Sequence, residues 1–192
     1  MLAFSSGEFV ENPKWLKKVE ERMAEKQRIL SKKVKGSKRW KRMCRQIAKL
    51  HLKVAHQCKD FYFKLAAWLV KEFDLICVED LSIKGLAQGK LSKSVLDASW
   101  SVFLYQIFPC KARSAGRKVM YVPASGASQT CAKCGGLVPK DLAARWHDCP
   151  HCGFSVHRDI NSALLILKLG LEQACKDWVT LQSCLHEAIG FS

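Results

Sequence analysis

The stretch "SQTCAKCGG" begins at Ser128, and "CPHCGFSVHRDINSALLIL" follows it at Cys149. Each part contains a Cys-x-x-Cys pair directly followed by glycine, whose missing side chain lets backbone amides turn toward the sulfurs. Four thiolates in two tight pairs suit a tetrahedral zinc ion with no open position, which is a structural site. The pattern therefore predicts a zinc ribbon over residues 128–157. The predicted zinc ligands are Cys131, Cys134, Cys149 and Cys152.

A redox-active or incidental pairing of these cysteines is the alternative interpretation, and three nearby histidines could substitute as ligands. These histidines are His147, His151 and His157. Six further cysteines are scattered in apolar or helical contexts, which is not the spacing of a secreted disulfide framework. They are Cys44, Cys58, Cys77, Cys110, Cys175 and Cys184. Because neither a signal peptide nor an apolar run long enough for a membrane helix is visible, we expect free thiols in a reduced cytoplasm.

Two acidic residues occupy positions that suit catalytic or metal-binding carboxylates. Asp159 follows shortly after the second cysteine pair and opens an apolar helix, where the helix dipole favours a carboxylate. Glu79 ends the apolar run of "FDLICVED", at the end of a strand where open α/β sheets place active sites. Two such acids, brought together, can hold Mg²⁺ ions of the kind that cleave phosphodiesters. A solvent-exposed strand end and a simple helix cap explain the same residues equally well.

The charge of the chain points to a polyanionic partner. The 192 residues carry a formal net charge of +15, with a hydrophobic content of 48% that can supply one α/β domain and a small insert. Much of the charge lies in residues 14–59, where 17 Lys or Arg residues accompany three acids. A solvated helix face usually mixes both signs, so this imbalance favours contact with the phosphates of a nucleic acid.

The same region predicts a long antiparallel helical hairpin over about residues 13–72. Asn12 and Pro13 suit an N-cap and a first helical position, and Gly36-Ser37 suits a helix stop followed by a new cap. From Trp40 to Trp68, apolar residues repeat every three or four positions, and His51 falls in this stripe, where we expect a core or seam histidine rather than a ligand. The predicted phosphate contacts lie around the turn of the hairpin and on the first cysteine pair. They are Lys32, Lys33, Lys35, Lys38, Arg39, Lys41, Arg42, Arg45 and Lys133.

The remaining elements are shorter. Residues 1–11 predict two strands around a turn at Ser6-Gly7, residues 75–78 a buried strand and residues 117–123 another strand. Residues 93–115 predict a helix that Pro109 kinks or shortens and that Gly116 closes. Residues 160–169 predict a buried helix. The helical spacing of the tail predicts a packing face formed by Trp178, Leu181, Leu185 and Ile189.

Several of these segments together resemble one protein family. The quoted cysteine segments, "VEDL" at Val78, "HRDINSA" at His157 and the hairpin "ENPKWLKKVEERMAEKQRILSKKVKGSKRWKR" are similar to the C-terminal half of TnpB-type proteins. These are RNA-guided DNA endonucleases encoded by insertion sequences, and they are relatives of the type V CRISPR effectors. The resemblance covers nearly everything from residue 1 to about residue 170, and the combination of motifs is specific.

The resemblance implies an α/β fold: a RuvC-type nuclease domain, RNase H-like, with a long helical hairpin and an inserted zinc ribbon. It implies a nuclease over residues 1–127, the ribbon over 128–157, and a final helix and tail over 158–192. Two of the three catalytic acids of the family match Glu79 and Asp159. The ribbon would then stand just before the element that bears the last acid, where it helps to hold the substrate.

The match leaves out the first catalytic Asp of the family. No "G-[IV]-D-x-G" segment is present, the guide-binding domains have no counterpart, and "PCKA" at Pro109 departs from the usual tyrosine-containing helix. We therefore expect an incomplete RuvC-like domain that binds DNA, holds structural zinc, and holds catalytic Mg²⁺ only if the site is completed. Guide RNA is a partner of the complete proteins of the family. We expect no association with a membrane, and we expect the chain in the cytoplasm, near the nucleoid.

Three hypotheses remain. The chain is an enzyme fragment that needs another chain to supply the missing strand and Asp, or it is a nucleic-acid-binding module without nuclease activity, or it is the decayed remnant of a transposase gene.

Overall fold

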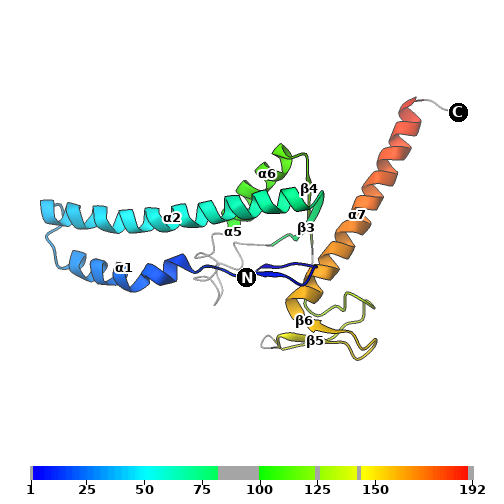
Figure 1. The fold of residues 1–192 in the computed structure, drawn as a ribbon, viewed down its shortest axis with the longest axis horizontal. Coiled ribbons are helices and arrows are strands. Elements are labelled where there is room, and N and C mark those ends of the chain that lie inside the picture. The colour runs from blue at the N-terminus through cyan, green and yellow to red at the C-terminus, as the bar shows by residue number, and fades with distance from the viewer. Residues whose placement is uncertain (1, 82–99, 124–125, 142–143, 190–192) are drawn as a thin grey trace. The chain divides into compact units, whose positions relative to one another are not determined.

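Two helices of unequal length, connected by a short loop, form the hairpin that the sequence predicts (Figure 1). The structure is a computed structural model and describes residues 2–81, 100–123, 126–141 and 144–189, without the side chains of residues 100 and 178–189. Helix α1 spans Trp15–Ser31 and helix α2 spans Lys38–Glu72. Their antiparallel direction follows from two contacts: Lys26 Nζ donates to Gln46 Oε1 at 2.9 Å, and the ring of Trp15 meets that of Phe61 at 5.4 Å.

The start of α1 corrects one prediction. Asn12 does not cap the helix, because its side chain accepts a hydrogen bond from the Lys14 backbone N–H at 3.0 Å, two residues on, in the manner of an Asx turn. Lys14 occupies the N-cap position with a left-handed φ of 53°, and no side chain caps the helix. The second start is confirmed, since Ser37 Oγ accepts from the Trp40 N–H at 3.1 Å.

The apolar stripe of α2 differs from the predicted one in its middle. His51 is exposed, so its prediction as a core residue is wrong. The buried side chains instead run from Ile47 through the half-buried Leu50 to Val54. Their spacing follows the ordinary helical period of about 3.6 residues rather than the coiled-coil period of about 3.5 residues. Trp68 at the far end of the predicted stripe is also 37% exposed.

The far half of α2 packs on a second helical segment. This segment contains α5 (Trp100–Val102), the π-helical turn η1 (Phe103–Ile107) and α6 (Phe108–Ser114). The rings of Tyr62 and Phe103 stack at 4.7 Å, and those of Phe103 and Phe108 at 5.6 Å. The predicted disturbance at Pro109 takes the form of the π-turn, in which the Phe108 N–H donates to the Phe103 carbonyl. Residues 93–99 of the predicted helix lie outside the described residues.

The strands form three small sheets of two strands each among the described residues. Strands β1 (Leu2–Ala3) and β2 (Phe9–Val10) are antiparallel, as predicted for residues 1–11. Strands β3 (Leu75–Glu79) and β4 (Lys118–Val122) are parallel, with Glu79 opposite Val122. Strands β5 (Trp146–Asp148) and β6 (Ser155–His157) are antiparallel. The fold is therefore mixed, with long helices and small sheets, and the predicted strands at 75–78 and 117–123 are confirmed.

Helix α7 (Arg158–Ile189) is a single helix where two segments were predicted (Figure 1). Its Leu165 and Ile166 join Val122 and Ala127 in one buried cluster, against which Cys77 packs. Gly170 makes this packing possible, because a Cβ there would lie 2.3 Å from Cys77 Sγ. The predicted packing face of the tail lies within residues 178–189, whose side chains the structure does not describe.

The chain divides into two units that alternate along the sequence. One unit comprises residues 1–11, 75–81 and 118–192, and the other comprises 12–74 and 82–117. The nine cysteines with described side chains are all free thiols. Among the described residues, no helix is both long and apolar enough to cross a membrane.

Candidate metal centre and acidic site

The two Cys-x-x-Cys segments fold into matching turns. The Gly135 N–H donates to the Cys131 carbonyl at 2.8 Å, and the Gly153 N–H donates to the Cys149 carbonyl at 3.0 Å. Both glycines have positive φ, 76° and 69°, which a residue with a side chain rarely adopts. The Gly136 N–H points at Cys134 Sγ at 3.4 Å. The glycines that follow each pair thus allow the turns that aim the sulfurs inward.

The four sulfurs lie in one group, all within 4.8 Å of one another. Cys131 and Cys152 sulfurs are 3.8 Å apart, and Cys134 and Cys149 sulfurs are 3.6 Å apart. A tetrahedron with metal–sulfur bonds of about 2.3 Å has sulfur–sulfur edges of about 3.8 Å. The donor set and its spacing therefore fit a metal ion held by four thiolates, and the histidines are not members of this group. We call the four residues the cysteine cluster.

The thiols of the cysteine cluster differ in pKa, so they do not ionise equally readily. Burial raises the pKa of the Cys149 thiol, but the backbone amides of His151 and Cys152 and the neighbouring thiols outweigh it and lower the pKa to about 6. For Cys152 the Phe154 amide lowers the pKa, yet burial and the three neighbouring thiols raise it to about 12. Thiols this close cannot all ionise unless a cation compensates their charge. A divalent metal would supply that compensation.

Asn161 connects the cluster to α7. Its side chain is fully buried; Oδ1 accepts the Ala132 N–H at 3.0 Å and Nδ2 donates to the Thr130 carbonyl at 2.7 Å. The amide thus satisfies two backbone groups on either side of Cys131 from the first turn of the helix. The role of Asn161 was not predicted from the sequence, although a polar side chain between Ile160 and the leucines of an apolar helix was a signal.

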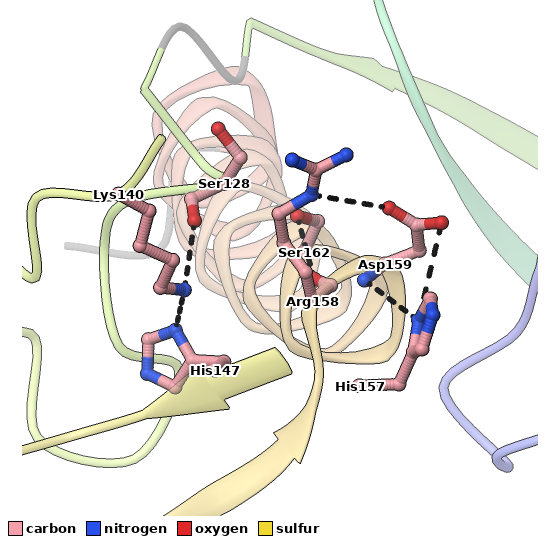
Figure 2. A network of polar contacts seen from close by, with 7 residues as sticks. All are labelled: Ser128, Lys140, His147, His157, Arg158, Asp159 and Ser162. Carbon is pink, nitrogen blue, oxygen red and sulfur yellow. Dashed lines mark hydrogen bonds and ion pairs between the residues drawn. The ribbon is translucent and has the colours of Figure 1, made fainter. Parts of the chain in front are cut away.

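A second buried polar contact supports the same segment (Figure 2). Lys140 Nζ contacts His147 Nδ1 and donates to the Ser128 carbonyl at 3.1 Å. Burial, followed by the charge of Lys140, lowers the pKa of the fully buried His147. His147 therefore has a packing role: its ring lies 6.3 Å from that of Phe154, which packs against the cluster cysteines, and the sequence could not distinguish this role from that of a ligand.

Asp159 lies in the first turn of α7, as predicted. Figure 2 shows its carboxylate between Arg158 and His157, with Oδ1 at 3.6 Å from Arg158 Nε and Oδ2 at 3.9 Å from His157 Nδ1. The Asp159 N–H donates to His157 Nδ1 at 3.3 Å. The side chain of Asp159 remains 34% exposed, so it is accessible to a ligand.

Glu79 is the last residue of β3 and is half-buried. Burial raises its pKa above the usual value of 4.5. Side chains alternate along a strand, so Glu79 shares the face of Cys77, which packs against α7 at Gly170, while the next residue, Asp80, is exposed. The two acids thus belong to elements of the same unit that pack on each other. A shared Mg²⁺ site between Glu79 and Asp159 stays a prediction.

The predicted phosphate contacts surround the turn between α1 and α2. Lys33 is half-buried and the other predicted residues, including Lys133 on the first cysteine pair, are exposed. Their contact with nucleic acid stays a prediction.

Two family models match the chain. Residues 1–89 match the OrfB family of IS605, described as "Probable transposase", and residues 103–166 match the "Cas12f1-like, TNB domain". A "TnpB-like protein L79" of Acanthamoeba polyphaga mimivirus is 33% identical over 71% of this chain and 27% of its own length. The chain is related to the TnpB-type proteins.

Further comparisons agree with this relation. A provisionally named RNA-guided DNA endonuclease of Streptomyces pristinaespiralis is 34% identical over 95% of this chain and 46% of its own length. The cryo-EM structure of a Cas12f1–sgRNA–target DNA complex matches with a TM-score of 0.52 and 21% identity, covering 79% of this chain and 41% of that chain, which shows a similar fold. The chain spans about half the length, or less, of the TnpB-type relatives that it matches.

Proposed function

We propose that this chain forms the nuclease portion of an RNA-guided DNA endonuclease of the TnpB type. In this proposal residues 128–157 are a zinc ribbon inserted in a RuvC-like, RNase H-like domain. The observation that carries the proposal is the junction at Asn161, where the helix turn that presents Asp159 is hydrogen-bonded to the backbone of the two residues that flank Cys131. The ribbon would therefore hold the acid-bearing end of α7 in place.

Zinc is the metal that best suits the cysteine cluster, because four thiolates in a closed tetrahedron match its structural sites. Its role would be to keep the segment around Thr130 and Ala132 folded, so that Asn161 keeps both backbone partners. The purified chain is expected to contain about one zinc per molecule, because the four thiolates form one closed site. Elemental analysis of a reduced, chelator-free preparation that finds no metal would contradict this role.

Glu79 and Asp159 would hold Mg²⁺, which when bound stabilises charge at the attacking and leaving oxygens of a phosphodiester. The raised pKa of Glu79 fits such a site, because a nearby cation favours the ionised carboxylate that burial disfavours. Asp159 is held by the helix start and by Arg158 while remaining partly exposed. The carboxylate oxygens of both side chains would therefore be available to bind Mg²⁺.

The 192 residues match only two of the three acids of the family, so we expect DNA binding without appreciable cleavage by this chain. The test is incubation of the chain with supercoiled and linear DNA and Mg²⁺, alone and with a peptide that carries the first strand and Asp of the family. Cleavage that appears only with the peptide and disappears in Glu79→Ala or Asp159→Ala supports the enzyme fragment. Binding with no cleavage in either mixture supports the second candidate, a nucleic-acid-binding module, which the exposed basic turn favours.

A further inference from the structure

Helix α7 carries a second apolar face, turned away from the face that packs on β3 and β4. Leu165, Ile166 and Gly170 lie on the packed face, in the core of their unit and against Cys77. The second face holds a shallow groove of about 640 Å³ with mostly apolar walls, and its lining residues, as far as the structure describes them, all belong to α7. Most of them lie beyond residue 166, where the match to the TNB domain ends.

The apolar residues of the groove follow one another at steps of three or four. They are Leu164, Leu167, Leu171 and Cys175, of which Leu171 is 46% exposed. These steps keep the four side chains on one side of the helix. A hollow between the side chains of a single helix is the kind of hole that a side chain of a second helix fills. The groove therefore fits a helix better than an extended strand.

Charged residues follow one edge of this groove. Lys168, Glu172 and Lys176 are exposed and four residues apart, so they form a single row of alternating sign. When two copies of a helix pack antiparallel about a two-fold axis, the same edge of each helix lies side by side, whereas a parallel pair brings opposite edges together. An antiparallel pair therefore places Glu172 of one copy beside Lys168 of the other. The helix whose charges complement the groove is a second α7.

We propose that the groove binds the same groove of a second copy of this chain, with the two α7 helices antiparallel and Leu171 at the two-fold axis. In this register Leu167 of one copy lies level with Cys175 of the other, so apolar side chains meet each other. Lys168 of one copy and Glu172 of the other differ in height by two residues, or about 3 Å, and this charge pair occurs twice. Lys176 lies further round the helix, because each step of four residues turns by about 40°. The inference rests on α7 alone and does not depend on the proposed function.

The salt dependence of this association differs from that of nucleic-acid binding. Each copy carries a net charge of +15, so two copies repel each other at low salt, and added salt screens the repulsion. Two exposed ion pairs contribute little, so contact between the leucines supplies most of the affinity. Association is therefore expected to strengthen as salt is added, whereas binding to phosphates weakens.

Sedimentation equilibrium of the full chain, freed of nucleic acid by nuclease treatment, measures the association over a range of chain and salt concentrations. The mass is expected to rise from 21.7 kDa toward twice that value as chain concentration increases. Leu171→Glu is expected to weaken the association by more than about 10-fold, because it places a charge from each copy in the apolar contact. The matched control is Leu52→Glu, since Leu52 is 55% exposed but lies on α2, in the other unit, and its effect should stay within about two-fold.

A charge exchange tests the antiparallel direction. Glu172→Lys is expected to weaken the association several-fold, because it brings like charges together twice, and the added change Lys168→Glu is expected to restore it. This restoration also decides the proposal if Leu171→Glu fails to fold, because both charge positions are exposed.

Disulfide cross-linking tests the register. Leu171→Cys combined with Cys175→Ser places two thiols opposite each other at the axis, so a mild thiol oxidant is expected to link the two copies. In the wild-type pair the two Cys175 residues are about 12 Å apart along the helices, too far for a disulfide. Cys175→Ser alone reports any link through other thiols.

Three results overturn the proposal. The first is a chain that stays monomeric at every chain and salt concentration, which means that the groove takes another occupant or none. The second is an equal loss of association in Leu171→Glu and Leu52→Glu, which places the contact elsewhere. The third is wild-type cross-linking through Cys175, which requires a parallel pair.

Discussion

At the scale of single residues, Asn161 shows how one buried amide can connect two parts of a site. Its two hydrogen bonds hold the backbone on both sides of Cys131, the first residue of the cysteine cluster, and they come from the turn that bears Asp159. The cysteine spacing alone predicted the cluster, because tetrahedral coordination of zinc by four thiolates requires two closely spaced cysteine pairs. It could not predict Asn161, whose role depends on which backbone groups the fold leaves unpaired.

Asn161→Leu is therefore expected to destabilise the chain by about 2–4 kcal/mol, because it leaves the part-buried Ala132 N–H and Thr130 carbonyl without their side-chain partner. Urea unfolding in zinc-containing buffer measures this. Ser162→Ala is the matched control: among the described residues its hydroxyl donates to the Arg158 carbonyl of the same turn and to no other group, so its effect should stay within about 0.5 kcal/mol. Equal stability of the Asn161→Leu and wild-type chains would show that the amide bonds do not hold the junction.

Glu79 gives a prediction in pH. A carboxyl whose folded pKa is raised binds its proton more tightly in the folded state, so folding is favoured at low pH and loses this advantage as pH rises from 4.5 through the raised value. Glu79→Gln, which never ionises, is expected to be more stable than wild type at neutral pH and no more stable below pH 4.5. Thermal unfolding across that pH range without divalent metal measures the difference. A Gln variant that is less stable at neutral pH would mean that the ionised carboxylate has a favourable partner.

At the scale of elements, the sequence predicted the helices and strands well where periodicity is long. The hairpin helices, the strand ending at Glu79 and the strand before Pro123 all fold as predicted. Errors arise where local signals compete: Asn12 bonds an amide two residues on, and His51 lies one position off the buried line. Such outcomes depend on tertiary packing, which a single sequence does not display.

Gly170 lies at the contact between α7 and β3, and its prediction belongs to this scale. Gly170→Ala adds a Cβ 2.3 Å from Cys77 Sγ and 2.9 Å from Cys77 Cβ, so α7 must move away from the strand. Despite the better helix propensity of alanine, we expect a net loss of about 1–3 kcal/mol. Adding Cys77→Ala removes the nearer atom and is expected to recover part of the loss in chemical denaturation. A loss that the second change leaves untouched would place the strain elsewhere.

At the scale of the whole molecule, charge is distributed unevenly between sequence regions. The turn between α1 and α2 belongs to one unit, and Glu79, Asp159 and the cysteine cluster belong to the other. If both units serve one nucleic acid, phosphates contact the turn while the substrate strand meets the second unit. The affinity contributed by the turn is then electrostatic and independent of sequence, because phosphate contacts carry no base information.

The double reversal Lys38→Glu with Arg42→Glu tests this division. Both side chains are exposed at the start of α2, and the chain carries a net charge of +15. Because each phosphate contact releases counterions, binding should fall by more than about 10-fold at low salt, and the slope of log affinity against log salt should flatten by about 1.8. The matched control is Lys168→Glu with Lys176→Glu on α7, which changes net charge equally. Titration of labelled duplex DNA at several salt concentrations compares the two. If both double variants lose affinity equally, net charge rather than the turn governs binding, whereas a loss confined to the Lys38 and Arg42 variant places phosphate contact at the turn.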